Sequence, residues 1–130
     1  MNAEELEDRL VTFAVRIGNL VDALPETRMG RHIAGQLVRC GTSPAPNYAE
    51  ACAGESRDDF IHKISIVLKE LRETRIWIKL ILRGGLLPDE RIADALNECD
   101  QLCNLFGQSV ATARANRGRK KSSPSSQFAI

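Results

Sequence analysis

The chain has 130 residues, of which 43% are hydrophobic and 27% are charged, and its formal net charge is +1 at pH 7. This length suits one globular domain. Because the chain starts with acidic residues, we expect no secretory signal. Because it has no run of about 18 apolar residues, we expect no membrane span. We therefore expect a cytoplasmic protein whose four cysteines are reduced thiols.

The first predicted helix covers residues 3–23. Its apolar residues alternate in steps of three and four, which is the spacing found in helix bundles. Acidic residues in its first turns suit the helix dipole, and Pro25 ends it. The apolar positions are Leu6, Leu10, Phe13, Ile17, Leu20 and Leu24.

The second predicted helix begins at Thr27, which is a suitable N-cap, and continues to Cys40. Gly41, Pro44 and Pro46 should then break or kink it, because each proline removes a backbone donor and crowds the preceding turn. The helical pattern resumes at Asn47 and ends near Gly54. We expect one helix kinked near Pro44 and Pro46 rather than a loop.

The third predicted helix begins after the N-cap Ser56 and ends at Gly84 and Gly85. One stripe of it faces the core, formed by Phe60, Ile64, Val67, Leu71, Thr74, Ile78 and Ile81. Further apolar residues lie outside that stripe: Ile61, Leu68, Ile76, Leu80 and Leu82. A helix that is apolar on two sides must be covered on two sides, so self-association is an early hypothesis.

The fourth predicted helix begins after Pro88, with Asp89 as its cap, and again shows the alternating apolar spacing. Four amphipathic helices on short connections predict an all-α, up-down-up-down antiparallel four-helix bundle. We assign residues 1–115 to the bundle and residues 116–130 to a basic, disordered C-terminal tail. Without the five basic residues from Arg114 onward, the body holds 13 basic and 17 acidic residues.

No catalytic or metal-binding motif is found in the sequence, so we expect no enzyme, no cofactor and no metal. His32 and His62 fit surface roles, and Cys99 and Cys103 read as small core residues four positions apart. Glu70 lies at the edge of the core stripe and should form a structural ion pair or hydrogen bond. Glu73 is four positions from Lys69, which predicts a helical ion pair.

The best functional candidate is a basic stripe on the third helix, formed by Lys69, Arg72, Arg75, Lys79 and Arg83. Steps of three and four place these cations on one face, which suits phosphate binding. The alternative is a solvated helix face, or one that pairs with acids of a neighbouring subunit. The two functional hypotheses are therefore a nucleic-acid-binding accessory protein and a protein-interaction scaffold that does not bind nucleic acid.

Two segments resemble a known family, namely TSPAPNYAEA (42–51) and SRDDFIHKISIVLKELRETRIW (56–77). They resemble the four-helix-bundle proteins encoded in intervening sequences of large-subunit ribosomal RNA genes, a family that includes the accessory variability proteins of diversity-generating retroelements. Phe13 to Ile17 and Arg39 also fit, whereas the two prolines of Pro44-Ala45-Pro46 depart from the usual single one.

The resemblance implies a homopentameric ring with a central channel. In the retroelement members it implies a basic surface that binds RNA or DNA and a reverse transcriptase. Carried to this chain, that surface corresponds to the basic stripe of Lys69, Arg72, Arg75, Lys79 and Arg83. The ribosomal members have no established activity, so the resemblance implies architecture more firmly than function.

Overall fold

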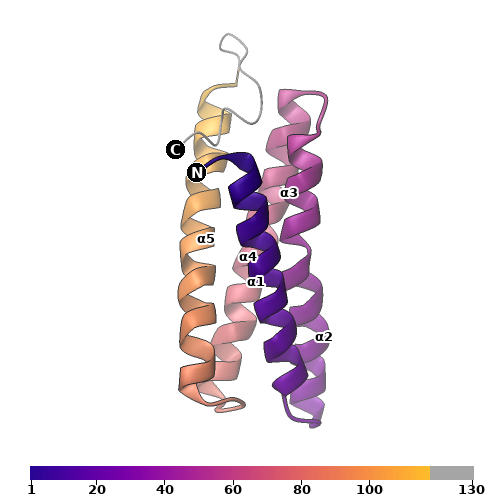
Figure 1. Ribbon diagram of the computed structural model, residues 1–130, viewed down its shortest axis with the longest axis vertical. Coiled ribbons are helices and arrows are strands. Elements are labelled where there is room, and N and C mark those ends of the chain that lie inside the picture. The colour runs from indigo at the N-terminus through magenta and orange to yellow at the C-terminus, as the bar shows by residue number, and fades with distance from the viewer. Residues whose placement is uncertain (118–130) are drawn as a thin grey trace.

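The structure, a computed structural model, describes residues 1–117 and places them in five helices. These are α1 (Ala3–Ala23), α2 (Arg28–Thr42), α3 (Pro44–Cys52), α4 (Arg57–Arg83) and α5 (Asp89–Ala115). No strand occurs in this described part of the chain. Figure 1 shows α3 continuing the line of α2, so that the five segments form four long rods packed along one another. The all-α, four-helix architecture predicted from the sequence is confirmed.

Local capping explains where the first helices begin. The Asn2 side chain accepts a hydrogen bond from the Glu5 N–H at 2.8 Å, and the Thr27 hydroxyl accepts one from the Gly30 N–H at 3.0 Å. Each contact satisfies a backbone donor that has no partner within its own helix. The predicted bounds of α1 and the predicted N-cap of α2 are confirmed.

The break between α2 and α3 is a single residue, Ser43, and its backbone angles remain helical (φ −70°, ψ −28°). The prediction of an interrupted helix rather than a loop is confirmed, but the predicted restart at Asn47 is wrong because α3 begins at Pro44. Both prolines stand in the first turn of α3, where a backbone N–H would have no helical partner, so they begin a helix rather than delay it. The Asn47 side-chain amide donates to the Ser43 carbonyl at 3.0 Å.

The predicted bounds of α4 are confirmed. The Ser56 hydroxyl accepts from the Asp59 N–H at 3.1 Å, and Gly84 and Gly85 end the helix, with Gly85 at a φ of +64° that favours glycine. The prediction that Asp89 caps α5 is wrong. Pro88 holds the cap position without a side-chain hydrogen bond, and Asp89 is the first helical residue, where its charge suits the helix dipole.

The core lies along the axis between the four rods. Every residue of the core stripe predicted on α4 is buried, and so is every apolar position predicted on α1. Both α1 and α4 pack against the α2–α3 rod on one side and α5 on the other, so they lie diagonally across the bundle. Over residues 1–117, no helix is both long and apolar enough to cross a membrane.

The predicted tail lies mostly outside the described part of the chain, which ends at residue 117. Its first two residues follow α5 directly and contact the start of α4. The Arg57 guanidinium donates to the Asn116 carbonyl at 2.8 Å, and Arg117 lies 3.4 Å from the Asp58 carboxylate. Residues 118–130, including three of the predicted tail cations, lie outside the described residues.

Candidate nucleic-acid interface

The five residues of the basic stripe lie on one side of α4, from the middle of the helix to its end. Lys69, Arg72 and Arg83 are exposed, whereas Arg75 and Lys79 are half-buried. A helix turns about 100° per residue, so steps of three and four keep these side chains within one sector of its surface. The sequence spacing therefore identified a set of neighbouring cations.

Arg75 differs from the other members of the stripe because a carboxylate of the neighbouring helix α5 lies beside its charge. One of its terminal nitrogens lies 3.7 Å from the Asp100 carboxylate on α5. Its Nε is buried and has no hydrogen-bond partner among the described residues. Arg75 consequently marks the edge of the stripe where α4 meets α5.

The other four cations, Lys69, Arg72, Lys79 and Arg83, have no carboxylate oxygen within 4.0 Å anywhere in residues 1–117. An exposed cation without a carboxylate partner can neutralise an external anion without first losing an internal ion pair. The outer face of α4 therefore offers positive charge that the bundle itself does not use.

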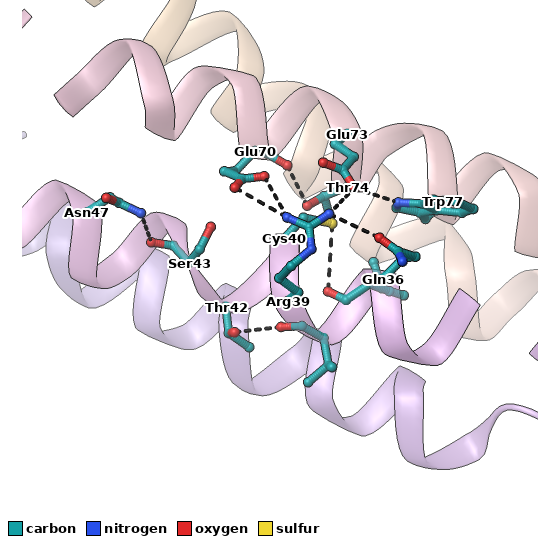
Figure 2. Close-up of polar contacts among 12 residues, drawn as sticks. Gln36, Arg39, Cys40, Thr42, Ser43, Asn47, Glu70, Glu73, Thr74 and Trp77 are labelled. Atoms are coloured by element: carbon teal, nitrogen blue, oxygen red, sulfur yellow. Dashed lines mark hydrogen bonds and ion pairs between the residues drawn. The ribbon is translucent and has the colours of Figure 1, made fainter. Parts of the chain in front are cut away.

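The acids of α4 that could cancel this charge are held by α2 instead. Figure 2 shows the Arg39 guanidinium between the carboxylates of Glu70 and Glu73. One Arg39 nitrogen lies 3.3 Å from Glu70 Oε2, and the other bonds Glu73 Oε2, which also accepts from the Trp77 indole N–H at 3.1 Å. Gln36 completes the cluster by accepting from Arg39 at 3.2 Å.

This cluster confirms one prediction and corrects another. Glu70, whose side chain is 16% exposed, has the structural ion pair that its place at the core edge predicted. The predicted pairing of Glu73 with Lys69 is wrong, because within the described residues Glu73 bonds Arg39 and Trp77. Spacing along one helix could not show that a guanidinium on another helix reaches the same carboxylate.

Two aliphatic side chains lie within the basic stripe. Ile76 is 54% exposed and Leu80 is 43% exposed, and they stand one helical turn apart. The other apolar residues outside the core stripe fare differently. Ile61 and Leu68 are buried within the single chain, and Leu82 is half-buried against its core. Of the five residues, Ile76 and Leu80 are the ones that the single chain leaves exposed.

The histidines and cysteines do not form a reactive centre. Cys99 and Cys103 are buried between α5 and α4, as predicted for small core residues. Their mutual hydrogen bond raises the pKa of Cys99, where burial adds to the effect, and lowers the pKa of Cys103. His32 and His62 are exposed, and His32 packs edge-on against Trp77 at 5.6 Å. In residues 1–117 no cluster of three or more potential ligands could hold a metal ion.

The turn between α3 and α4 carries an open hollow of about 360 Å³. The Lys63 ammonium and the Glu50 carboxylate form a 2.9 Å ion pair there, and His62 and Asp59 lie at its edge. A solvent-open hollow whose lysine is already paired lacks the enclosed, convergent groups of a catalytic pocket.

Comparisons with known proteins agree with this architecture. The model of the 23S rRNA-intervening sequence protein family matches residues 6–108. A solved structure of a protein of unknown function, from the S23 ribosomal protein family of Bacteroides thetaiotaomicron VPI-5482, is 33% identical to this chain with a TM-score of 0.75. That similarity covers 86% of this chain and 100% of the other. No curated protein matches the chain. Neither the family description nor that of the solved structure names an enzyme. Because the family model matches most of its length, the chain belongs to the 23S rRNA-intervening sequence protein family.

Proposed function

We propose that this protein is a non-enzymatic, cytoplasmic accessory protein that binds the phosphates of RNA or DNA through the outer face of α4. The observation that carries the proposal is the group of four exposed or half-exposed cations without a carboxylate partner in the described chain: Lys69, Arg72, Lys79 and Arg83. Arg39 supports it indirectly, because its positive charge offsets part of the negative charge of Glu70 and Glu73, which lie on α4.

The dimensions of the stripe suit a nucleic-acid backbone. From Lys69 to Arg83 the helix rises by about 21 Å, at about 1.5 Å per residue. Four phosphate contacts predict that the logarithm of the binding constant falls with the logarithm of salt concentration with a slope of about −3 to −4. Repetition of the stripe in an oligomer would steepen that dependence.

The test is salt-dependent retention on single-stranded RNA and on duplex DNA. The double variant Arg72→Glu and Lys79→Glu should lose retention while keeping its helical circular dichroism. The matched control, Arg28→Glu and Arg91→Glu, changes the net charge equally at exposed positions outside α4, and it should retain most of the binding. Equal retention by both variants would show that the basic stripe of α4 is not the phosphate-binding site.

We also propose that the predicted up-down-up-down bundle works as a homo-oligomer, in the form of a pentameric ring. Support comes from Ile76 and Leu80, which the single chain leaves exposed within a charged face. In a ring the basic stripe would be present once per subunit, which would concentrate positive potential around one axis. Light scattering should give a multiple of the 14.4 kDa chain mass.

A second candidate function is a scaffold that binds another protein, for which a reverse transcriptase is one candidate partner. The same two aliphatic side chains favour this alternative, because exposed apolar surface contributes to protein contacts and not to phosphate binding. Affinity capture before and after nuclease digestion separates the two candidates. A protein partner that remains bound after digestion supports the scaffold, and one that is lost supports nucleic-acid binding.

A further inference from the structure

We propose that copies of this chain associate side by side, with the outer face of α4 in one copy docked along the outer face of α1 in the next. This inference rests on the proposed self-assembly and names the surfaces that would form it. The two surfaces have opposite charge, each has an exposed aliphatic centre, and they lie at matching heights in the bundle.

The α1 surface is acidic with an aliphatic centre. Val11 and Val15 are 47% and 60% exposed, and Asp8 and Asp22 are exposed before and after them. Neither aspartate has a cation within 4.0 Å in the described part of the chain. We call Asp8, Val11, Val15 and Asp22 the α1 surface.

The α4 surface has the same plan with the opposite charge. It consists of Lys69, Ile76, Leu80 and Arg83, all of them exposed. The charged ends of the two surfaces have identical spacing, since Lys69 and Arg83 each lie seven positions from Ile76, and Asp8 and Asp22 each lie seven positions from Val15. Seven residues are close to two helical turns, so each charged pair lies in line with its central aliphatic residue.

The heights of the two surfaces can be compared through α5, which contacts both helices. Arg9 of α1 forms a 2.7 Å ion pair with Glu98, and the Cys99 thiol donates to the carbonyl of Leu71 of α4 at 3.4 Å. Arg9 therefore lies at about the level of Leu71. Farther along, Arg16 contacts Asp94 and Arg114 contacts Ser65, so α1 and α4 both run antiparallel to α5.

This alignment places complementary groups at nearly the same height. Leu71 of α4 lies at about the level of Arg9 of α1, and Ile76 is five residues after Leu71. Ile76 therefore lies level with residues 13–14 of α1, between Val11 and Val15. Lys69 then falls within about two residues of Asp8, a rise of about 3 Å, and Arg83 is equally close in height to Asp22. A rotation about an axis parallel to the rods leaves heights unchanged. It would therefore bring cation to carboxylate and aliphatic to aliphatic.

The position of the two helices fits a head-to-tail contact. Since α1 and α4 lie diagonally across the bundle, each copy presents one surface of each kind in different directions, as a closed ring requires. A symmetric contact of α4 with α4, or of α1 with α1, would instead bring like charges together. The charge pattern thus favours the heterologous arrangement over a two-fold dimer.

This contact would divide the basic stripe between two tasks. Lys69 and Arg83 would pair with the next copy, whereas Arg72 and Lys79 lie on the side of Ile76 that turns toward Arg75 and α5. Arg72 and Lys79 would therefore stay available for phosphate at the border of the contact, so that each subunit of the assembly would offer these two cations and the unassembled chain would offer all four. The two tasks can be tested with different variants.

The experiment measures the mass of the full chain by light scattering at micromolar concentration, with helical circular dichroism as the check on folding. Wild type should give a multiple of 14.4 kDa. Lys69→Asp with Arg83→Asp should give 14.4 kDa, and so should Asp8→Lys with Asp22→Lys. Combining all four substitutions restores complementarity and should restore the assembled mass. Arg28→Asp with Arg91→Asp, the control of equal charge, should leave the mass at the wild-type value.

A monomeric wild type, an unchanged mass in either reversed pair, or a folded four-fold variant that stays monomeric would overturn the contact. Nucleic-acid binding is judged separately through Arg72→Glu with Lys79→Glu, which should retain the assembled mass and lose retention. If only retention fails to respond, the proposed function is wrong and the contact stands. If only the mass fails to change in the variants with reversed charges, the proposed contact is wrong and phosphate binding by Arg72 and Lys79 stands.

Discussion

Gly41 of α2 lies directly against Ile17 of α1, so closely that a Cβ atom on Gly41 would stand 2.6 Å from Ile17 Cγ2 and 3.1 Å from Ile17 Cβ. Ile17 is completely buried, so moving it away from Gly41 would disturb its neighbours in the packed core. This close approach lies two residues before the break at Ser43. It sets the distance between α1 and the α2–α3 rod where the rod changes helix.

Substituting Gly41→Ala should therefore lower the free energy of unfolding by about 1–3 kcal/mol through overpacking. Gly35, in the same helix, is the matched control because a Cβ there meets no atom within 4 Å. Gly35→Ala should raise stability by about 0.5–1 kcal/mol through reduced backbone entropy in the unfolded chain. Urea unfolding followed by circular dichroism measures both, and a stabilising Gly41→Ala would contradict the close contact.

Leu71 tests the core assignment of α4. It is fully buried, so Leu71→Ala should cost about 2–5 kcal/mol through lost burial and the cavity left behind. Phe13→Ala on α1 should cost a similar amount for the same reason. Met29, which is 56% exposed, is the control, and Met29→Ala should change stability by less than about 0.5 kcal/mol. Thermal melting that hardly distinguishes the three variants would show that the core stripes are misplaced.

Arg39→Gln should lower the melting temperature, because it leaves the neighbouring carboxylates of Glu70 and Glu73 without their shared cation. It should also weaken nucleic-acid retention, since two uncompensated negative charges would then lie beside the basic stripe. Adding Glu70→Gln and Glu73→Gln to Arg39→Gln should recover much of both losses. Retention that is indifferent to Arg39 would show that the cluster serves stability alone.

Alkaline pH should lower the free energy of unfolding, because the folded state favours the protonated forms of two buried groups that the unfolded chain deprotonates more easily. Burial raises the pKa of the Cys40 thiol and, together with a hydrogen bond to Cys52, that of the Tyr48 phenol. Both groups hold a proton more tightly in the folded state, so their contribution is complete below the unfolded pKa values, about 8.5 and 10, and is lost as pH rises.

The free energy of unfolding should fall by up to about 1.4 kcal/mol per pH unit for each such group. Tyr48→Phe removes one titrating group from the core and should flatten the decline above about pH 10, relative to wild type. Urea unfolding at intervals from about pH 7 to pH 11 gives the comparison. Parallel pH curves for wild type and Tyr48→Phe would exclude Tyr48 as a source of the decline.

The sequence by itself determined the secondary structure of this protein, because caps, breakers and apolar period are local properties. Thr27 and Ser56 begin helices where their hydroxyls meet free backbone donors, and Gly85 ends one with a positive φ. The family resemblance carried by residues 42–51 and 56–77 was likewise confirmed. Two local features were misjudged: Pro44 starts a helix immediately after a single intervening residue, and Pro88 rather than Asp89 holds the cap position of α5.

Only the tertiary structure decided which apolar and charged groups the bundle itself satisfies. Periodicity gives the angle at which a side chain leaves its helix, but not how wide an arc the neighbouring rods cover. That arc includes Ile61 and Leu68 and leaves Ile76 and Leu80 in solvent. Likewise, Glu73 pairs with Arg39 rather than Lys69, because ion pairing depends on which guanidinium the packing of α2 against α4 brings within reach.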